Sequence, residues 1–162
     1  MNIALCGFMG AGKTSVGREL SKITGRRFVD TDELAEKEEN TTVSRIFSDK
    51  GEAYFRDLEY EICKKTAHMN NTVISTGGGA MTYERNVKAI KRAARVVFID
   101  TPFDVICKRV GDASGRPLFK NRENAKNLFE ERRSKYIAAA DFVVNGDQSV
   151  KKIAAEIAEL VK

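Results

Sequence analysis

The feature that most constrains this chain is a glycine-rich turn close to the start of the sequence, which leads into lysine and threonine. Residues 7–14 read G-F-M-G-A-G-K-T and complete the pattern G-x-x-x-x-G-K-[ST]. Glycines let the backbone curl so that successive N–H groups point inward as an anion-binding nest, and the positive end of the following helix faces the same spot. An apolar strand is predicted at Ile3–Cys6, before the turn. Val16, Leu20 and Ile23 recur after it at the spacing of an inward helix face. These flanks favour a nucleotide phosphate site over a turn that merely precedes a helix.

The residues of this loop have predicted roles. Lys13 reaches the outer phosphates and Thr14 ligates Mg²⁺. The predicted nucleotide-binding residues are Gly10, Ala11, Gly12, Lys13, Thr14 and Ser15.

The length of 162 residues favours one domain, 1–162. No apolar run approaches the roughly 20 residues of a membrane span, so no membrane association is expected. Cys6, Cys63 and Cys107 lack metal-ligand spacing and favour a reducing, cytoplasmic setting. The net charge of +5 admits nucleic acid, but the basic residues are scattered and single-strand-binding signatures are absent. We therefore expect no nucleic-acid partner and favour a small enzyme with two anionic ligands. A monomer is expected as well.

Apolar runs of strand length alternate with helix-length amphipathic segments. The runs are Ile3–Cys6, Phe28–Val29, Val73–Ile74, Val96–Ile99 and Phe142–Val144. The alternation predicts an α/β fold of three layers, α/β/α, around a central five-stranded parallel sheet. The last helix is predicted to point Val150, Ile153, Ile157 and Leu160 inward. Ligands of such sheets collect beyond the carboxyl ends of the strands, so the residues that follow each run are site candidates.

Two carboxylates, Asp30 and Asp32, follow the second run. For one of them, a plain helix N-cap is the alternative interpretation. Beside a phosphate loop, one suits Mg²⁺ and the other suits a base that accepts a hydroxyl proton. In the helical stretch that follows, Arg56 is a site candidate, although a solvated surface arginine is the commoner case.

Three successive glycines, Gly77, Gly78 and Gly79, follow the third run. A backbone without side chains lets a ligand lie directly against it, so we predict a ligand wall rather than a flexible turn. Farther on, Arg116 lies in a loop of small and polar residues that is either a mobile lid or a plain connector. Arg132 falls on the apolar stripe of a helix, a costly position unless the side chain reaches an anion.

Together these motifs resemble the shikimate kinases, small phosphate-loop kinases similar to the nucleoside-monophosphate kinases. The resemblance runs from the first strand to the last helix. Beyond the phosphate loop it rests on F-V-D-T-D at 28–32, G-E-A-Y-F-R at 51–56, S-T-G-G-G at 75–79, R-P-L-F at 116–119 and R-R-S-K-Y at 132–136. It implies transfer of the ATP γ-phosphoryl group to the 3-hydroxyl of shikimate, with Mg²⁺, in aromatic amino-acid biosynthesis. It also implies a lid at about 110–124 and a substrate-binding helical segment at about 32–62.

The resemblance assigns roles residue by residue. Lys13, Asp32 and Arg116 are the implied catalytic residues, and Thr14 and Asp30 are the implied metal ligands. Arg109 and Arg116 join the nucleotide site, with Arg109 over the adenine. The implied shikimate-binding residues are Asp32, Arg56, Gly77, Gly78, Gly79 and Arg132, with the two arginines on the carboxylate.

One departure leaves an alternative open, since Ser134-Lys135 stand where the family usually has Pro-Leu. Arg133 is therefore a possible substitute for Arg132. Gluconate and nucleotide kinases share the loop, but paired arginines with three glycines favour a small carboxylated polyol. A GTPase switch is disfavoured because the sequence contains no N-K-x-D.

Overall fold

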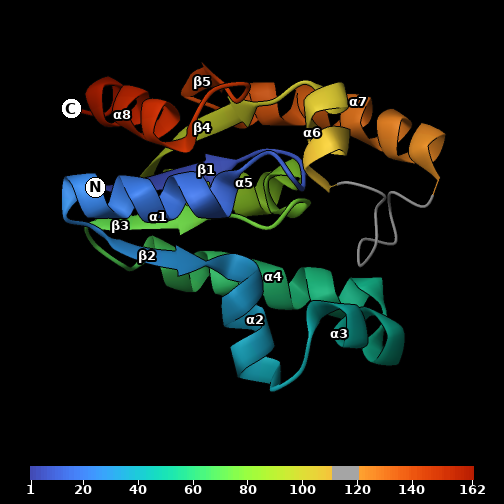
Figure 1. The fold of residues 1–162 in the computed structure, drawn as a ribbon. Helices are drawn as coiled ribbons and strands as arrows, with labels where there is room; N and C mark the ends of the chain where they lie inside the picture. Colours follow the sequence, from blue (N-terminus) through green and yellow to red (C-terminus); the bar gives the residue numbers. More distant parts are fainter. Residues whose placement is uncertain (111–120) are drawn as a thin grey trace.

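The computed structural model describes residues 1–110 and 121–162. Within these residues it contains one parallel sheet, whose strands lie in the order β2-β3-β1-β4-β5 (Figure 1). The strands are β1 Asn2–Cys6, β2 Arg27–Asp30, β3 Thr72–Ser75, β4 Ala94–Asp100 and β5 Phe142–Asn145. The five-stranded parallel sheet predicted from the apolar runs is confirmed. Strands β3 and β2 lie on one side of β1, and β4 and β5 lie on the other, so the strand order switches direction at β1. In such sheets ligands bind at this switch point.

Helices cover both faces of the sheet (Figure 1). The α-helices are α1 Lys13–Thr24, α2 Thr31–Glu39, α3 Val43–Lys50, α4 Glu52–Ala67, α5 Glu84–Lys91, α6 Phe103–Val110, α7 Arg122–Ala139 and α8 Val150–Leu160. A short 3₁₀ helix, η1, spans Ala80–Thr82. Helices α1 and α8 pack together on one face, while α4, α5 and α7 lie on the other. None of the described helices combines the length and the apolar character that crossing a membrane requires.

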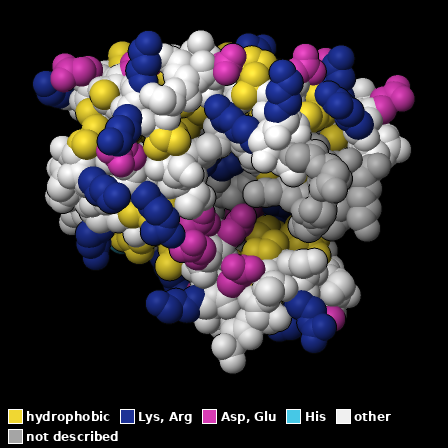
Figure 2. All heavy atoms as spheres, viewed as in Figure 1, with side chains coloured by type: hydrophobic (Ala, Val, Ile, Leu, Met, Phe, Trp, Pro, Cys, Tyr) yellow, Lys and Arg dark blue, Asp and Glu magenta, His cyan; other side chains and the backbone are white. Residues whose placement is uncertain are grey.

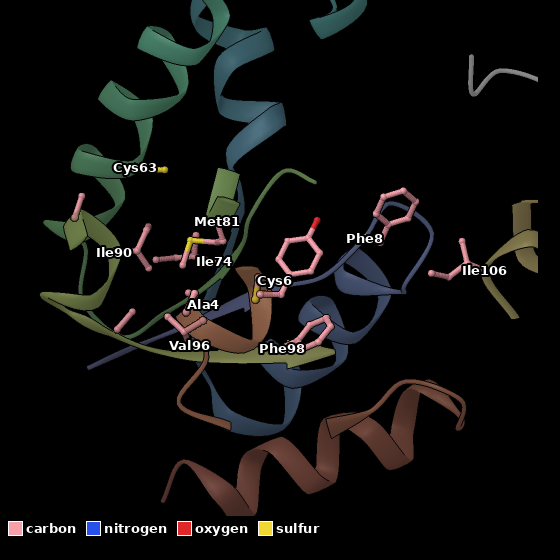
Figure 3. Packing of buried hydrophobic residues seen from close by; sticks show 14 of the residues in the cluster. Ala4, Cys6, Phe8, Cys63, Ile74, Met81, Ile90, Val96, Phe98 and Ile106 are labelled. Atoms are coloured by element: carbon pink, nitrogen blue, oxygen red, sulfur yellow. The ribbon is translucent and has the colours of Figure 1, made fainter. Parts of the chain in front are cut away.

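The core against α4, α5 and α7 contains the largest group of buried side chains. Ala4, Ile74, Met81 and Val96 pack together beside the sheet, and Phe8 lies farther along it (Figure 3). Phe8 is 1% exposed although it belongs to the phosphate loop. The loop is thereby anchored in the core by its own side chain.

Helices α2, α3 and α4 hold a smaller apolar cluster of their own. Its buried members are Ala35, Ile46, Phe55, Leu58 and Ile62. These helices lie below the sheet in the view of Figure 1 and correspond to the helical stretch expected to bind substrate.

Three expectations of burial are wrong. Ile23 is 50% exposed, and Val150 and Leu160 are each 38% exposed. At the end of α8 the core-facing stripe continues from Ile157 to the C-cap residue Val161, four residues on, instead of to Leu160, three residues on. Positions i+3 and i+4 fall on opposite sides of a helical stripe, so periodicity alone does not choose between them. Ile23 and Val150 lie in terminal turns of their helices.

Candidate active site

The phosphate loop joins β1 to α1 at the switch point of the sheet. Gly10 and Gly12 have φ values of 84° and 103°, a left-handed conformation that favours glycine. Gly12 is also the N-cap of α1, and no side chain caps this helix. The first N–H groups of α1 therefore remain available to an anion, which the positive end of the helix dipole also attracts.

Lys13 is buried within this loop. Its Nζ donates to the carbonyl oxygen of Gly7 at 2.6 Å and to that of Phe8 at 3.1 Å. The ammonium group is therefore held at the loop by backbone oxygens. A phosphate bound there lies within reach of this charge.

Arg109 links the phosphate loop to the segment after β5. Its guanidinium donates to the carbonyl oxygens of Ala11 at 3.2 Å and Gly146 at 2.8 Å. Thr101, which follows β4, donates to the same Ala11 oxygen at 3.1 Å. These hydrogen bonds thus connect the side of the loop where a nucleotide base is expected to the segments that follow β4 and β5.

Asp30 combines two of the roles considered from the sequence. One carboxylate oxygen caps α2 by accepting from the N–H groups of Asp32 at 2.8 Å and Glu33 at 3.2 Å. The other oxygen faces the Thr14 hydroxyl at 3.4 Å. A hydroxyl and a carboxylate oxygen are hard ligands of the kind Mg²⁺ takes, and this ion usually completes its shell with water and phosphate oxygens. The residues present therefore fit Mg²⁺.

The Asp32 carboxyl holds its proton more tightly than an ordinary aspartate. Burial, and then repulsion from Asp30, raise its pKa from 3.8 to about 6, although Lys13 and Arg56 oppose the rise. Near neutral pH this group is ionised yet close to its pKa, as suits a proton acceptor.

The three glycines each face a different charged side chain. A Cβ atom on Gly77 would overlap the carboxylate of Asp32. A Cβ on Gly79 would lie 2.7 Å from Nη1 of Arg56, and one on Gly78 would lie 3.5 Å from Nη1 of Arg132. Glycine at the outer two positions therefore lets the Asp32 and Arg56 side chains approach the backbone this closely, a reason that the sequence analysis did not identify.

Arg56 is held in place, unlike a solvated surface arginine. Its Nη1 donates to both oxygens of Glu59, at 3.0 and 3.2 Å. Its guanidinium also lies 5.0 Å from the ring centroid of Tyr83 and 5.4 Å from that of Phe55. These contacts fix the cation in front of the glycine loop.

Glu59 is a residue that the sequence analysis missed. It is 3% exposed, and burial raises the pKa of its carboxyl while the Arg56 charge opposes the rise. Asn86 donates to the same carboxylate at 3.4 Å and to the carbonyl of Ala80 at 2.9 Å. The sequence feature that could have identified Glu59 is its position three residues after Arg56 on a helix, a spacing at which opposite charges pair.

The neighbouring arginines of α7 point to different places. Arg132 lines the cavity beside the glycines, with its guanidinium 5.9 Å from the ring centroid of Phe8. Arg133 makes two bonds to Asp100, from Nε at 3.1 Å and Nη2 at 2.7 Å. Of the two, only Arg132 faces the cavity that Arg56 also lines.

Two adjoining cavities result, and Met9, Asp32 and Gly78 line both. One, of about 460 Å³, lies over the phosphate loop. The other, of about 450 Å³, lies among α3, α4, α7 and the glycines. Figure 2 shows this face hollowed at its middle, with acidic side chains gathered at the rim.

Among the expected site residues, the structure therefore brings the phosphate loop, the two aspartates, the three glycines and three arginines, Arg56, Arg109 and Arg132, around one pair of cavities. Arg116 and most of the expected lid lie outside the described residues.

Comparison with known proteins gives consistent matches along the chain. The family model for shikimate kinase matches residues 9–162. A shikimate kinase of Aquifex aeolicus (strain VF5) is 44% identical over 158 residues, which cover 97% of this chain and 94% of the relative. One from Persephonella marina is 41% identical, over 96% of each chain.

Solved structures give the same result. A shikimate kinase from Acinetobacter baumannii in complex with shikimate superposes with a TM-score of 0.92 at 32% identity, covering 99% of this chain and 92% of that one. The shikimate kinase from Aquifex aeolicus has a TM-score of 0.85 at 42% identity, with coverages of 99% and 96%.

Proposed function

The chain belongs to the shikimate kinase family, and from this premise we propose which substrate each of its two cavities binds. Its activity is that of a shikimate kinase, an ATP-dependent step of the shikimate pathway toward aromatic amino acids. The cavity over the phosphate loop takes ATP, and the adjoining cavity takes shikimate. The observation that carries this division is the pair Arg56 and Arg132 on the second cavity alone, beside the Asp32 carboxylate that both cavities share.

In the nucleotide cavity, backbone N–H groups of residues 10–15 receive the phosphates at the start of α1. Lys13 exchanges its carbonyl partners for the outer phosphates. Arg109 lies at the adenine end, where it already bridges the loop and the segment after β5. Arg116 approaches the phosphates from the lid at about 110–124, and this assignment rests on the R-P-L-F motif.

Mg²⁺ is held by Thr14 and, directly or through water, by Asp30. When bound, the ion neutralises phosphate charge and orients the γ-phosphoryl group. The capping bonds of Asp30 to α2 hold its carboxylate beside Thr14 without any metal.

In the acceptor cavity, Arg56 and Arg132 bind the shikimate carboxylate, a planar anion that guanidinium groups bind bidentately. Asp32 accepts from the ring hydroxyls, and residues 77–79 present backbone to the ring. The segment 32–62 supplies one wall of this cavity, and α7 and the glycines supply the other. The ring is thereby oriented with its carboxylate at the arginines and its 3-hydroxyl toward the nucleotide.

Transfer forms a bond between the 3-hydroxyl oxygen and the γ-phosphorus and breaks the bond from that phosphorus to the β–γ bridging oxygen, which leaves with ADP. Asp32 takes the hydroxyl proton as the new bond forms. Positioning and charge stabilisation supply most of the catalysis in phosphoryl transfer. We further propose that residues 1–162 form one domain that acts as a cytoplasmic monomer.

The test compares ADP release from Mg²⁺-ATP with and without shikimate in three variants. Arg56→Met and Arg132→Met are each expected to raise the KM for shikimate at least about tenfold, because a charge-assisted pair is lost. The KM for ATP should change less than about twofold, since neither residue lines the nucleotide cavity.

Arg133→Met is the matched control, one residue away on the same helix. It loses an exposed ion pair with Asp100 and should leave both KM values unchanged. A rise in the shikimate KM in Arg133→Met, with none in Arg132→Met, would contradict the assignment of the carboxylate to Arg132.

A further inference from the structure

Tyr136 lies at the junction between α7 and the glycine loop and has no role in the proposal above. It is 1% exposed, and its ring packs on that of Phe98 with centroids 5.2 Å apart. Its hydroxyl donates to the carbonyl oxygen of Gly78. One side chain of the helix that carries Arg132 therefore bonds directly to the backbone that lines the acceptor cavity.

The glycine loop depends on backbone bonds for its position because it has no side chains. Gly77 is fixed at one end by its N–H, which donates to the Thr31 hydroxyl at 2.8 Å. Gly79 is fixed at the other end by its carbonyl, which accepts from the Thr82 hydroxyl at 2.7 Å. At Gly78, in the middle, the bond to Tyr136 supplies the attachment.

The amide N–H groups of Gly78 and Gly79 are directed to no protein acceptor within the described residues. Both glycines line the acceptor cavity. These N–H groups are thus available to an oxygen of the substrate. The Gly79 N–H belongs to the same planar peptide group as the Gly78 carbonyl, and the Gly78 N–H belongs to the adjoining peptide group, so a bond that fixes the carbonyl also orients these donors.

Tyr136 and Arg132 are four residues apart on α7 and share a helix face. The Arg132 charge acts on the Tyr136 phenol, and a Cβ on Gly78 would lie 3.5 Å from Nη1 of Arg132. The guanidinium, the phenol and the middle glycine therefore meet at one place.

We propose that Tyr136 is a positioning residue for the acceptor site, whose hydroxyl holds the glycine loop against α7 so that the loop amides and Arg132 meet shikimate as one prearranged surface. This inference rests on the proposed binding of shikimate in that cavity. Burial raises the pKa of the Tyr136 phenol well above its usual value of 10, so the hydroxyl remains a donor across the working pH range.

The test is Tyr136→Phe, which removes the hydroxyl and keeps the ring on Phe98. The KM for shikimate is expected to rise about two- to twelvefold, the change that corresponds to the loss of one neutral hydrogen bond. The KM for ATP and the slow release of ADP without shikimate should not change. Tyr60→Phe, on a half-buried ring packed against the same core, is the matched control and should behave as the wild type.

A second arm separates positioning from mere stability and from failure of the proposed site. If Tyr136 acts through Arg132 and the loop, the double variant Tyr136→Phe/Arg132→Met raises the shikimate KM by less than the product of the single effects. An unchanged shikimate KM in Tyr136→Phe, or equal rises in both KM values with a lowered Tm, overturns the positioning role. Arg132→Met with a normal shikimate KM instead overturns the proposed carboxylate site.

Discussion

Replacing Asp32 by asparagine is expected to stabilise the fold near neutral pH while it removes most of the activity. The pKa of this carboxyl rises from 3.8 to about 6 on folding, chiefly through burial and repulsion from Asp30. The folded chain therefore binds more protons than the unfolded chain between these values, and stability falls as pH rises through this window. At 1.36 kcal/mol for each pKa unit, the cost above about pH 6 is at most roughly 3 kcal/mol.

Asparagine cannot ionise, so it removes this cost without removing a bond, because no protein group in the described residues hydrogen-bonds to the Asp32 side chain. In urea denaturation near neutral pH, Asp32→Asn should be more stable than the wild type by roughly 1–3 kcal/mol. At about pH 4 the two should unfold with nearly equal free energies. The value of kcat should fall at least about a hundredfold if Asp32 is the proton acceptor.

The neighbouring carboxylate provides a control of opposite sign. Asp30→Ala removes the cap of α2 and should destabilise the fold by about 0.5–2 kcal/mol. An Asp32→Asn variant that is less stable than the wild type near neutral pH would refute the argument, since the buried charge would then not be the dominant effect.

Two further substitutions test the packing around the glycine loop. Gly79→Ala places a methyl group 2.7 Å from Nη1 of Arg56 and should raise the shikimate KM about tenfold or more, whereas Gly78→Ala, with 3.5 Å to its nearest neighbour, should have a smaller effect in the same assay. Thr31→Val keeps the shape of a buried side chain but leaves the Gly77 N–H without its acceptor, so urea denaturation should show a loss of about 1–3 kcal/mol. An unchanged KM in the first case, or an unchanged midpoint in the second, would contradict the contacts on which these expectations rest.

The sequence predicted the sheet and the phosphate loop because both follow from local patterns. Each strand was marked by an apolar run, and the loop carried glycines at Gly10 and Gly12, where the structure needs left-handed backbone. Helix faces were predicted less well, as Ile23 and Leu160 show, because one residue of rotation decides whether a terminal side chain meets the sheet.

The contacts that organise the site depend on residues far apart in the chain, so local patterns did not reveal them. The sequence left Arg132 and Arg133 open as alternatives. What separates them in the structure is Asp100, about 33 residues away, which binds Arg133 through two bonds. The hydroxyl of Tyr136 likewise meets Gly78 across 58 positions. No spacing rule connects such pairs, because only the folded sheet brings β4, the glycine loop and α7 together.

The acceptor cavity keeps like charges close together only because opposite charges are buried with them. Arg56 and Arg132 line one cavity, and the carboxylate of Glu59, a residue only 3% exposed, pairs with Arg56. Asp32 adds a second carboxylate on the side of the nucleotide. An uncharged ligand would displace water from the guanidinium groups and supply no anion of its own, whereas, in the binding mode proposed above, a carboxylate supplies one and leaves the hydroxyl groups of the ligand to Asp32. The proposed selectivity for a carboxylated polyol thus agrees with the charges that line this pocket.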